Sequence, residues 1–135
     1  VPGVKYTHII DDAYNASPLS VSSALETLKA LPGKRKIVVL GDMLEIGRYA
    51  MEEHEKVGAQ AAKIAHIIVT VGPRAKFIAE GARKAGFSKK NVLSFDIAED
   101  AQAPVQKLMK KGDLILIKGS RAIGLEKVVE EIRAF

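Results

Sequence analysis

The stretch DLILIKGSRAIGLEKVV at residues 113–129 joins an apolar run to a polar loop and then to a helical pattern. The stretch THIIDDAYNASP at residues 7–18 is organised in the same way. Because each apolar run leads straight into a loop that opens a helix, we expect both loops to leave the carboxyl edge of one parallel sheet. Such sheets bind their ligands at that edge, so these loops are the first candidates for a functional site.

Three more apolar runs lie between these two, which gives five predicted strands. Most of the runs are continuous in Val, Ile or Leu rather than alternating with polar residues, as is typical of strands that are covered on both faces. The predicted strands are residues 7–11, 36–41, 66–71, 92–95 and 113–118.

Helical patterns fill the intervals between the strands. The first begins with Ser17 as a capping residue and Pro18 at the first helical position, and Pro32 with Gly33 ends it. Gly86 ends the third helix. The later helices are predicted at residues 50–65, 73–85, 98–110 and 124–135.

The alternation of strands and helices predicts an α/β fold class. We expect a Rossmann-like, doubly wound, mostly parallel open sheet of about five strands with flanking helices. Pro104 is expected to break the fourth helix or to delay its start, because proline lacks the amide proton that an interior helical position uses. No repeat or linker interrupts the pattern, so residues 1–135 are expected to form a single domain.

The composition is that of a folded protein with an aliphatic core, since 47% of residues are hydrophobic and only 5% are aromatic. The absence of cysteine excludes a disulfide framework and a thiolate zinc site. No apolar run approaches the roughly 18 residues of a membrane span, and the N-terminus lacks the pattern of a signal peptide. We therefore expect a cytoplasmic protein without a membrane partner.

The formal net charge of +5 would suit phosphate-bearing ligands or nucleic acid. The lysines, however, are spread over predicted helices and turns, and no aromatic platform accompanies them. We interpret most of the charges as solvated helix faces and expect no nucleic-acid partner.

The loop after the first strand is a candidate nucleotide site. Asp12 is placed to accept hydrogen bonds from a ribose, while Tyr14 and Asn15 can stack on and hydrogen-bond to a base. The free amide groups at the start of the next helix favour an anion or a sugar hydroxyl. Asp, Asn and Ser are also ordinary turn and cap residues, so the residues alone leave a structural role open.

The loop after the second strand carries two acids. Gly41 permits a tight exit, and Asp42 and Glu45 place carboxylates near the same edge of the sheet. Paired acids can bind a substrate ammonium group or assist proton transfer, or they can cap the following turn. His54 falls inside the next helix and is interpreted as a packed residue rather than a ligand.

The loop after the last strand is a candidate clamp for a carboxylate or a phosphate. Lys118 and Arg121 offer cationic donors, Ser120 a hydroxyl group, and Gly119 a flexible amide close to a helix start. The alternative is a lysine and an arginine that are simply solvated at the beginning of a helix.

Several common kinds of site are excluded because the sequence lacks their motifs. Gly124 is followed by Leu125 and Glu126, where a Walker P-loop needs Lys and then Ser or Thr, and GKRK at residues 33–36 also fails that motif. No G-x-G-x-x-G follows a predicted strand, and no Ser-His-Asp or Cys-His nucleophile system is suggested. The residues alone therefore indicate a ligand-binding α/β domain with three polar edge loops.

Taken together and in order, IDDAYNASP (residues 10–18), VLGDMLEIG (39–47) and IKGSRAIGLEKVV (117–129) resemble motifs of the Mur ligase family. The resemblance runs over nearly the whole chain and corresponds to the family's C-terminal domain. It is nearest to members that add D-alanyl-D-alanine to UDP-N-acetylmuramoyl-tripeptide. It implies that the chain is part of a longer ligase, with the N-terminal domain and the P-loop central domain outside it.

The resemblance implies an ATP-dependent amide ligase of peptidoglycan precursor synthesis. ATP would phosphorylate the terminal carboxylate of the peptide, and the amine would then attack the acyl phosphate. ATP and Mg²⁺ would be bound mainly by the central domain, onto which this domain would close. No catalytic residue and no metal ligand is expected in this domain, which by itself should have no ligase turnover.

Roles for the three loops also follow from the resemblance. Asp12 would reach the ATP ribose, with Tyr14 and Asn15 toward the base. The last loop would position the amine substrate directly, through Lys118, Gly119, Ser120 and Arg121. The loop after the second strand would line that site less directly, through Gly41, Asp42 and Glu45.

Two positions depart from the family pattern and bear on the choice of amine. They are Ala13, and Ser17, where relatives often carry asparagine. The alternatives are therefore a Mur-like ligase for another amino acid, a folylpolyglutamate or cyanophycin type of ligase, and a non-catalytic binding module.

Overall fold

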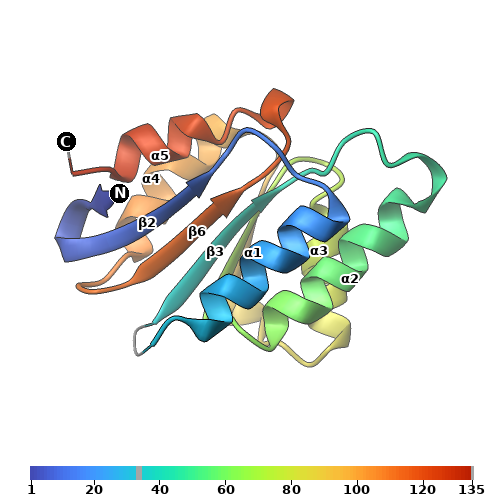
Figure 1. The fold of residues 1–135 in the computed structure, drawn as a ribbon, viewed down its shortest axis with the longest axis horizontal. Helices are drawn as coiled ribbons and strands as arrows, with labels where there is room; N and C mark the ends of the chain where they lie inside the picture. The colour runs from blue at the N-terminus through green and yellow to red at the C-terminus, as the bar shows by residue number, and fades with distance from the viewer. Residues whose placement is uncertain (33–34, 135) are drawn as a thin grey trace.

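A six-stranded sheet lies at the centre of the computed structural model, which describes residues 1–32 and 35–134 (Figure 1). The strand order is β1-β2-β6-β3-β4-β5. Strands β2 to β6 pair in parallel, and β1 pairs antiparallel with β2. The strands are β1 (Pro2–Gly3), β2 (Thr7–Asp12), β3 (Lys36–Gly41), β4 (Ile67–Val71), β5 (Val92–Phe95) and β6 (Leu114–Lys118).

Helices cover both faces of this sheet (Figure 1). One face carries α1 (Pro18–Ala30), α2 (Ala50–Ala62) and α3 (Lys76–Lys84), and the other carries α4 (Ala98–Leu108) and α5 (Glu126–Ile132). Short 3-10 turns occur at η1 (Val4–Tyr6), η2 (Gly47–Tyr49), η3 (Lys89–Asn91) and η4 (Arg121–Ile123). Within the ranges that the structure describes, no helix is long and apolar enough to span a membrane.

The predicted α/β fold class is confirmed, and each of the five predicted strands is present to within one residue. Strand β1 was not predicted, because two residues are too short to show periodicity. Helix α1 ends at Ala30, just before the predicted stop at Pro32. Gly33, the second residue of that stop, lies outside the described residues, as does Phe135, the predicted end of the last helix. In the described part, that last helix ends at Ile132.

The expectation for Pro104 is wrong, because this residue lies inside α4 without ending it. Ala98 and Ala101 on one side of the proline, and Val105 on the other, are buried against the sheet. Packing of this apolar face therefore holds the helix together despite the missing amide proton.

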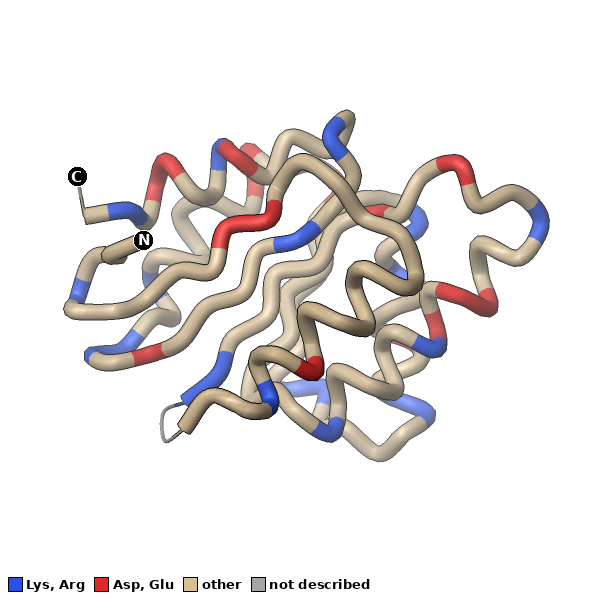
Figure 2. The backbone as a smooth tube through the Cα atoms, viewed as in Figure 1, with Lys and Arg blue, Asp and Glu red and all other residues tan. Residues whose placement is uncertain are grey.

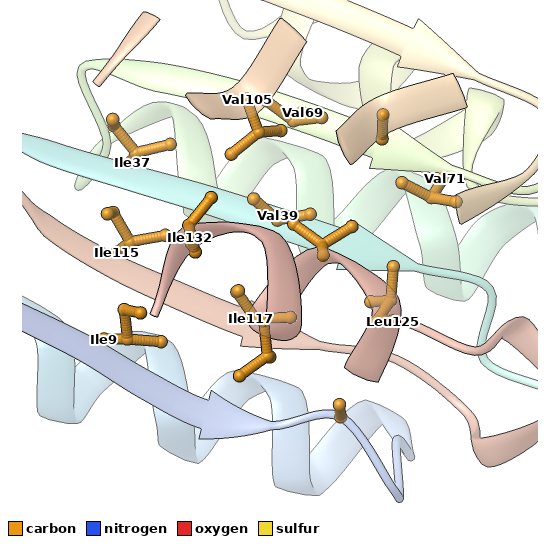
Figure 3. Packing of buried hydrophobic residues seen from close by; sticks show 14 of the residues in the cluster. Ile9, Ile37, Val39, Val69, Val71, Val105, Ile115, Ile117, Leu125 and Ile132 are labelled. Carbon is orange, nitrogen blue, oxygen red and sulfur yellow. The ribbon is translucent and has the colours of Figure 1, made fainter. Parts of the chain in front are cut away.

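Two hydrophobic cores sandwich the sheet. Along β3, Ile37 and Val39 face α4 and α5 (Figure 3), whereas Val38 and Leu40 face α1, α2 and α3. All four side chains are at most 1% exposed. Burial of such a side chain contributes about 1.5–3 kcal/mol, so a central strand gains most from being apolar at every position. This explains the continuous apolar runs in the sequence.

The topology opens a crevice at the carboxyl edge of the sheet. Strands β2 and β3 lead into α1 and α2 on one face, and β6, which lies between them, leads into α5 on the other face. The loops that follow neighbouring strands therefore diverge at this point. Such switch points are where open α/β sheets bind ligands.

Helices α2 and α3 approach each other closely at two glycines. A Cβ atom on Gly58 would lie 1.9 Å from the carbonyl oxygen of Ile78, and one on Gly81 would lie 2.0 Å from that of Glu55. Both obstacles are main-chain atoms, which cannot turn aside as a side chain can. This contact fixes the position of α2, whose first residues support the loop after β3.

We predict that Gly81→Ala lowers the free energy of unfolding by about 1–3 kcal/mol, because the added methyl group forces the helices apart. At a solvent-exposed helix position the same substitution would raise the free energy of unfolding by about 0.5–1 kcal/mol. The sign of the change therefore shows whether the two helices are in close contact. Denaturant unfolding measures the difference. Ser23→Ala at an exposed site on α1 is the control and should change stability by less than about 0.5 kcal/mol. Equal or greater stability of Gly81→Ala would contradict the close approach.

Candidate functional site

A pocket of about 500 Å³ lies at the carboxyl edge of the sheet, at the switch point. Its walls come from the loops that follow β2, β3 and β6, which are the three polar loops singled out in the sequence. The lining residues are Tyr14, Asn15, Ala16, Leu44, Glu45, Ser120, Arg121 and Ala122. Segments more than 100 residues apart in the chain therefore share one site.

An ion pair joins the first and the last of these loops. Asp12 and Lys118 are register partners at the ends of β2 and β6, and Figure 2 shows an acidic segment beside a basic one at this place. The Lys118 ammonium group donates hydrogen bonds to Asp12 Oδ2 and to the carbonyl oxygen of Asn15, the latter at 2.9 Å. A buried ammonium group needs such partners, since desolvation without them is costly.

Lys118 and Asp12 differ in solvent exposure, which indicates different roles for the two side chains. The side chain of Lys118 is only 2% exposed, whereas that of Asp12 is 46% exposed. A carboxylate accepts several hydrogen bonds, so Asp12 keeps capacity for a further donor from solvent or a ligand. Lys118 instead points into the loop at residues 12–15, which differs from the expected direct contact with substrate.

The loop after β2 presents two consecutive side chains to solvent. Tyr14 and Asn15 are exposed at the pocket, while Ala13 and Ala16 are buried beneath them. The main-chain amide of Ala13 donates to Asp11 Oδ1 at 3.2 Å, which fixes the turn. The loop therefore presents an aromatic ring and a carboxamide on a main chain that is fixed by this hydrogen bond.

A capping box formed by Ser17 and Ser20 provides hydrogen-bond partners for main-chain amides at the start of α1. Ser17 Oγ accepts from the main-chain amide of Ser20 at 3.1 Å, and Ser20 Oγ accepts from that of Ser17 at 2.9 Å. This confirms the predicted cap. It also engages amide groups that were expected to attract an anion, so the exposed side chains of the loop are the stronger candidates for ligand contact.

Asp42 does not face the pocket. Its side chain is fully buried, and Oδ1 accepts from the main-chain amide of Ala75 at 2.7 Å, while Arg74 Nη1 lies 3.4 Å from Oδ2. A Cβ atom on Gly72, whose φ is +116°, would lie 2.3 Å from the same Oδ1. The carboxylate thus supports the turn between β4 and α3, which differs from the expected role near the amine substrate.

Ser120 connects the loops after β3 and β6. Its main-chain amide donates to the Asp42 carbonyl at 2.9 Å, and its Oγ accepts from the Leu44 amide at 2.8 Å. Behind it, a Cβ atom on Gly119 would lie 2.8 Å from Leu125 Cδ1 and 3.1 Å from the Cα of Gly41. Gly119 therefore serves the close approach of two strand ends rather than supplying a flexible amide.

Charges of opposite sign lie on the walls of the pocket. Glu45 and Arg121 are both exposed, and both line it. The main chain of Glu45 has φ of +65°, a left-handed conformation that side-chain-bearing residues rarely adopt. This conformation persists only where the surroundings favour it, so the main chain at Glu45 depends on the rest of the loop.

His54 and Arg74 make hydrogen bonds in this region that the sequence pattern did not indicate. His54 is buried, as expected, but its Nε2 lies 2.9 Å from the amide nitrogen of Met43 in the loop after β3. Arg74 reaches Asp42 from the loop after β4. Both contacts join distant segments, so no local spacing could have revealed them. Among residues 1–32 and 35–134, no group of three or more His, Cys, Asp or Glu side chains could hold a metal ion.

Residues 1–121 match the family described as Mur ligase, glutamate ligase domain. The chain is 42% identical over 127 residues to the UDP-N-acetylmuramoyl-tripeptide–D-alanyl-D-alanine ligase of Bacillus subtilis, which covers 92% of this chain and 27% of that protein. It is 34% identical over 125 residues to the ligase of the same name from Treponema pallidum, again with 27% of that protein covered. The chain therefore spans about a quarter of the length of these curated relatives.

Solved structures give the same result. The MurF ligase of Thermotoga maritima in complex with ADP is similar with a TM-score of 0.75 and 30% identity, over 97% of this chain and 30% of that one. A structure of MurF from Acinetobacter baumannii is similar with a TM-score of 0.76 and 30% identity, over 91% of this chain and 27% of that one. The extent of the family match, together with the three loops gathered at one pocket, decides the assignment: this chain belongs to the Mur ligase family, as its glutamate ligase domain.

Proposed function

We propose that this chain is the C-terminal domain of an ATP-dependent amide ligase that joins D-alanyl-D-alanine to UDP-N-acetylmuramoyl-tripeptide in peptidoglycan precursor synthesis. The observation that carries the proposal is the pocket at the switch point, which unites the three motif loops. The names of the relatives support the choice of substrates.

The first loop is the nucleotide side of the proposed site. Asp12 would accept hydrogen bonds from the ribose hydroxyl groups of ATP, because its half-exposed carboxylate is held at the edge by Lys118. The exposed Tyr14 and Asn15 would stack on and hydrogen-bond to the base. The ADP in the Thermotoga maritima relative supports a nucleotide ligand. Lys118 acts here as a positioning residue.

The opposite charges of the pocket suit the amine substrate. D-alanyl-D-alanine is a zwitterion, with a carboxylate at one end and an ammonium group at the other. Arg121 would bind the carboxylate, since guanidinium groups pair with carboxylates through two hydrogen bonds. Glu45 would attract the ammonium group, and the Ser120 hydroxyl would contribute from between the loops.

Chemistry and metal binding would lie largely outside this domain. The donor set of the described residues does not suit Mg²⁺, so we propose that the metal and the triphosphate are held by a P-loop central domain of the longer protein. Closure of this domain onto the central one would orient the amine and exclude water at the acyl phosphate. The isolated domain should therefore have no ligase turnover. A cytoplasmic location stays a prediction.

We predict that Asp12→Asn in the full-length ligase raises the KM for ATP roughly 10-fold to 100-fold, as expected for loss of a charge-assisted hydrogen bond. The KM for D-alanyl-D-alanine should change less than about three-fold. Asp11→Asn is the matched control, because an Asn side chain still accepts from the Ala13 amide. Steady-state kinetics on both variants make the comparison, and equal ATP dependence of Asp12→Asn and the native enzyme would refute the nucleotide assignment.

We predict the opposite pattern for Arg121→Ala. The KM for D-alanyl-D-alanine should rise at least roughly 10-fold, because the carboxylate loses its charged partner, and the KM for ATP should stay within about three-fold. Lys127→Ala is the control, since this exposed cation pairs with Glu99 away from the pocket. Profiling of other amines with the same variants tests the choice of substrate. A rise in KM for ATP alone would move Arg121 to the nucleotide side.

A further inference from the structure

The imidazole of His54 bridges helix α2 and the loop after β3. The ring is fully buried. Its Nδ1 lies 2.6 Å from the carbonyl oxygen of Ala50, one helical turn earlier, and its Nε2 lies 2.9 Å from the amide nitrogen of Met43. Both ring nitrogens therefore have main-chain partners.

The chemistry of these partners fixes the proton of the ring. A carbonyl oxygen only accepts, so Nδ1 must donate to Ala50. A main-chain amide only donates, so Nε2 must accept from Met43. His54 is therefore the neutral imidazole with its proton on Nδ1. Neither the Nε2–H tautomer nor the imidazolium can make both bonds, since each would set a donor against the Met43 amide.

The bond to Met43 completes the support of the loop after β3. The residue before it, Asp42, accepts from the Ser120 amide, and the residue after it, Leu44, donates to Ser120 Oγ. Ser120 thus holds the loop from the side of β6, and His54 holds it from the side of α2. The next residue is Glu45, whose left-handed main chain depends on what surrounds it.

We propose that His54 is a positioning residue for the amine side of the pocket. By accepting from Met43 as the Nδ1–H tautomer, it fixes the wall formed by Leu44 and Glu45, and through that wall it sets the affinity for the substrate ammonium group. The link to substrate rests on the proposed function, whereas the tautomer and the support of the loop rest on geometry alone.

Two substitutions separate this role from simple packing. In His54→Gln the side-chain carbonyl reaches the position of Nε2 and can still accept from Met43. In His54→Asn the shorter carboxamide reaches only the position of Nδ1 and leaves the Met43 amide without its acceptor. Both variants are neutral and polar, and they differ in which of the two bonds they keep. Gln keeps the acceptor for the Met43 amide, whereas Asn keeps the donor to the Ala50 carbonyl.

The first measurement is made on the 135-residue chain without ligand. Nitrogen-15 NMR of the His54 ring should show the proton on Nδ1. The amide of Met43 should exchange with solvent much faster in His54→Asn, by at least roughly 10-fold, and stay within about three-fold of the native rate in His54→Gln. A proton on Nε2, or equal exchange in the two variants, would overturn the proposal.

The second measurement uses the full-length ligase. His54→Asn should raise the KM for D-alanyl-D-alanine at least roughly 10-fold, His54→Gln less than about three-fold, and the KM for ATP should change in neither. Equal dipeptide KM values for the two variants would refute the positioning role. If His54→Asn does not fold, two measurements decide whether the proposal stands. They are the tautomer of the His54 ring in the native chain and the exchange rate of the Met43 amide in His54→Gln.

These readouts also separate this proposal from the proposed function. A ligase that responds to His54→Asn but not to Asp12→Asn would retain the positioning role and refute the nucleotide assignment. A protein with the Nδ1–H ring and the expected exchange rates, but without ligase activity in any longer form, would retain the support of the loop and refute the function.

Discussion

Insertion of β6 between β2 and β3 is the constraint on which the site depends. Because β6 is the last strand of the chain and β2 and β3 are the first two long ones, this pairing brings the two ends of the sequence together. Its parallel register sets Lys118 beside Asp12 and also beside Leu40 in β3. Because β6 leads into a helix on the opposite face from the helices that follow β2 and β3, the crevice that holds the pocket opens at this point.

Buried polar groups hold the walls of that crevice. Lys118, Asp42, His54 and Ser120 are each at most 9% exposed. Lys118 bonds to the main chain of the loop after β2, Asp42 to that of the turn after β4, and His54 and Ser120 both to that of the loop after β3. A buried polar group that lost its partner would carry a large desolvation penalty, so these bonds favour one arrangement of the loops. The exposed side chains between them are thereby presented on a rigid frame, which suits a site that must orient two substrates.

The sequence pattern was most reliable where one physical cause acted locally. Continuous apolar runs located the strands, and the serine before Pro18 located the start of α1, since burial on both faces and amide capping each leave a short-range signature. It failed at Pro104, where packing of α4 outweighed a missing amide proton. It also could not separate Asp12 from Asp42 or Arg121 from Lys118, because a residue type does not reveal whether its charge is exposed or buried.

The sequence by itself determined the fold class, the family resemblance and the three loops in which function was to be sought. Tertiary structure alone decided that these loops form one pocket, that Lys118 and Asp42 support it from within, and that the His54 ring lies between the Ala50 carbonyl and the Met43 amide. The physical reason is that local patterns record burial and turn chemistry over a few residues, whereas hydrogen-bond partners across the sheet edge depend on strand order. Strand order is set by packing of the whole chain and leaves no mark at any single position.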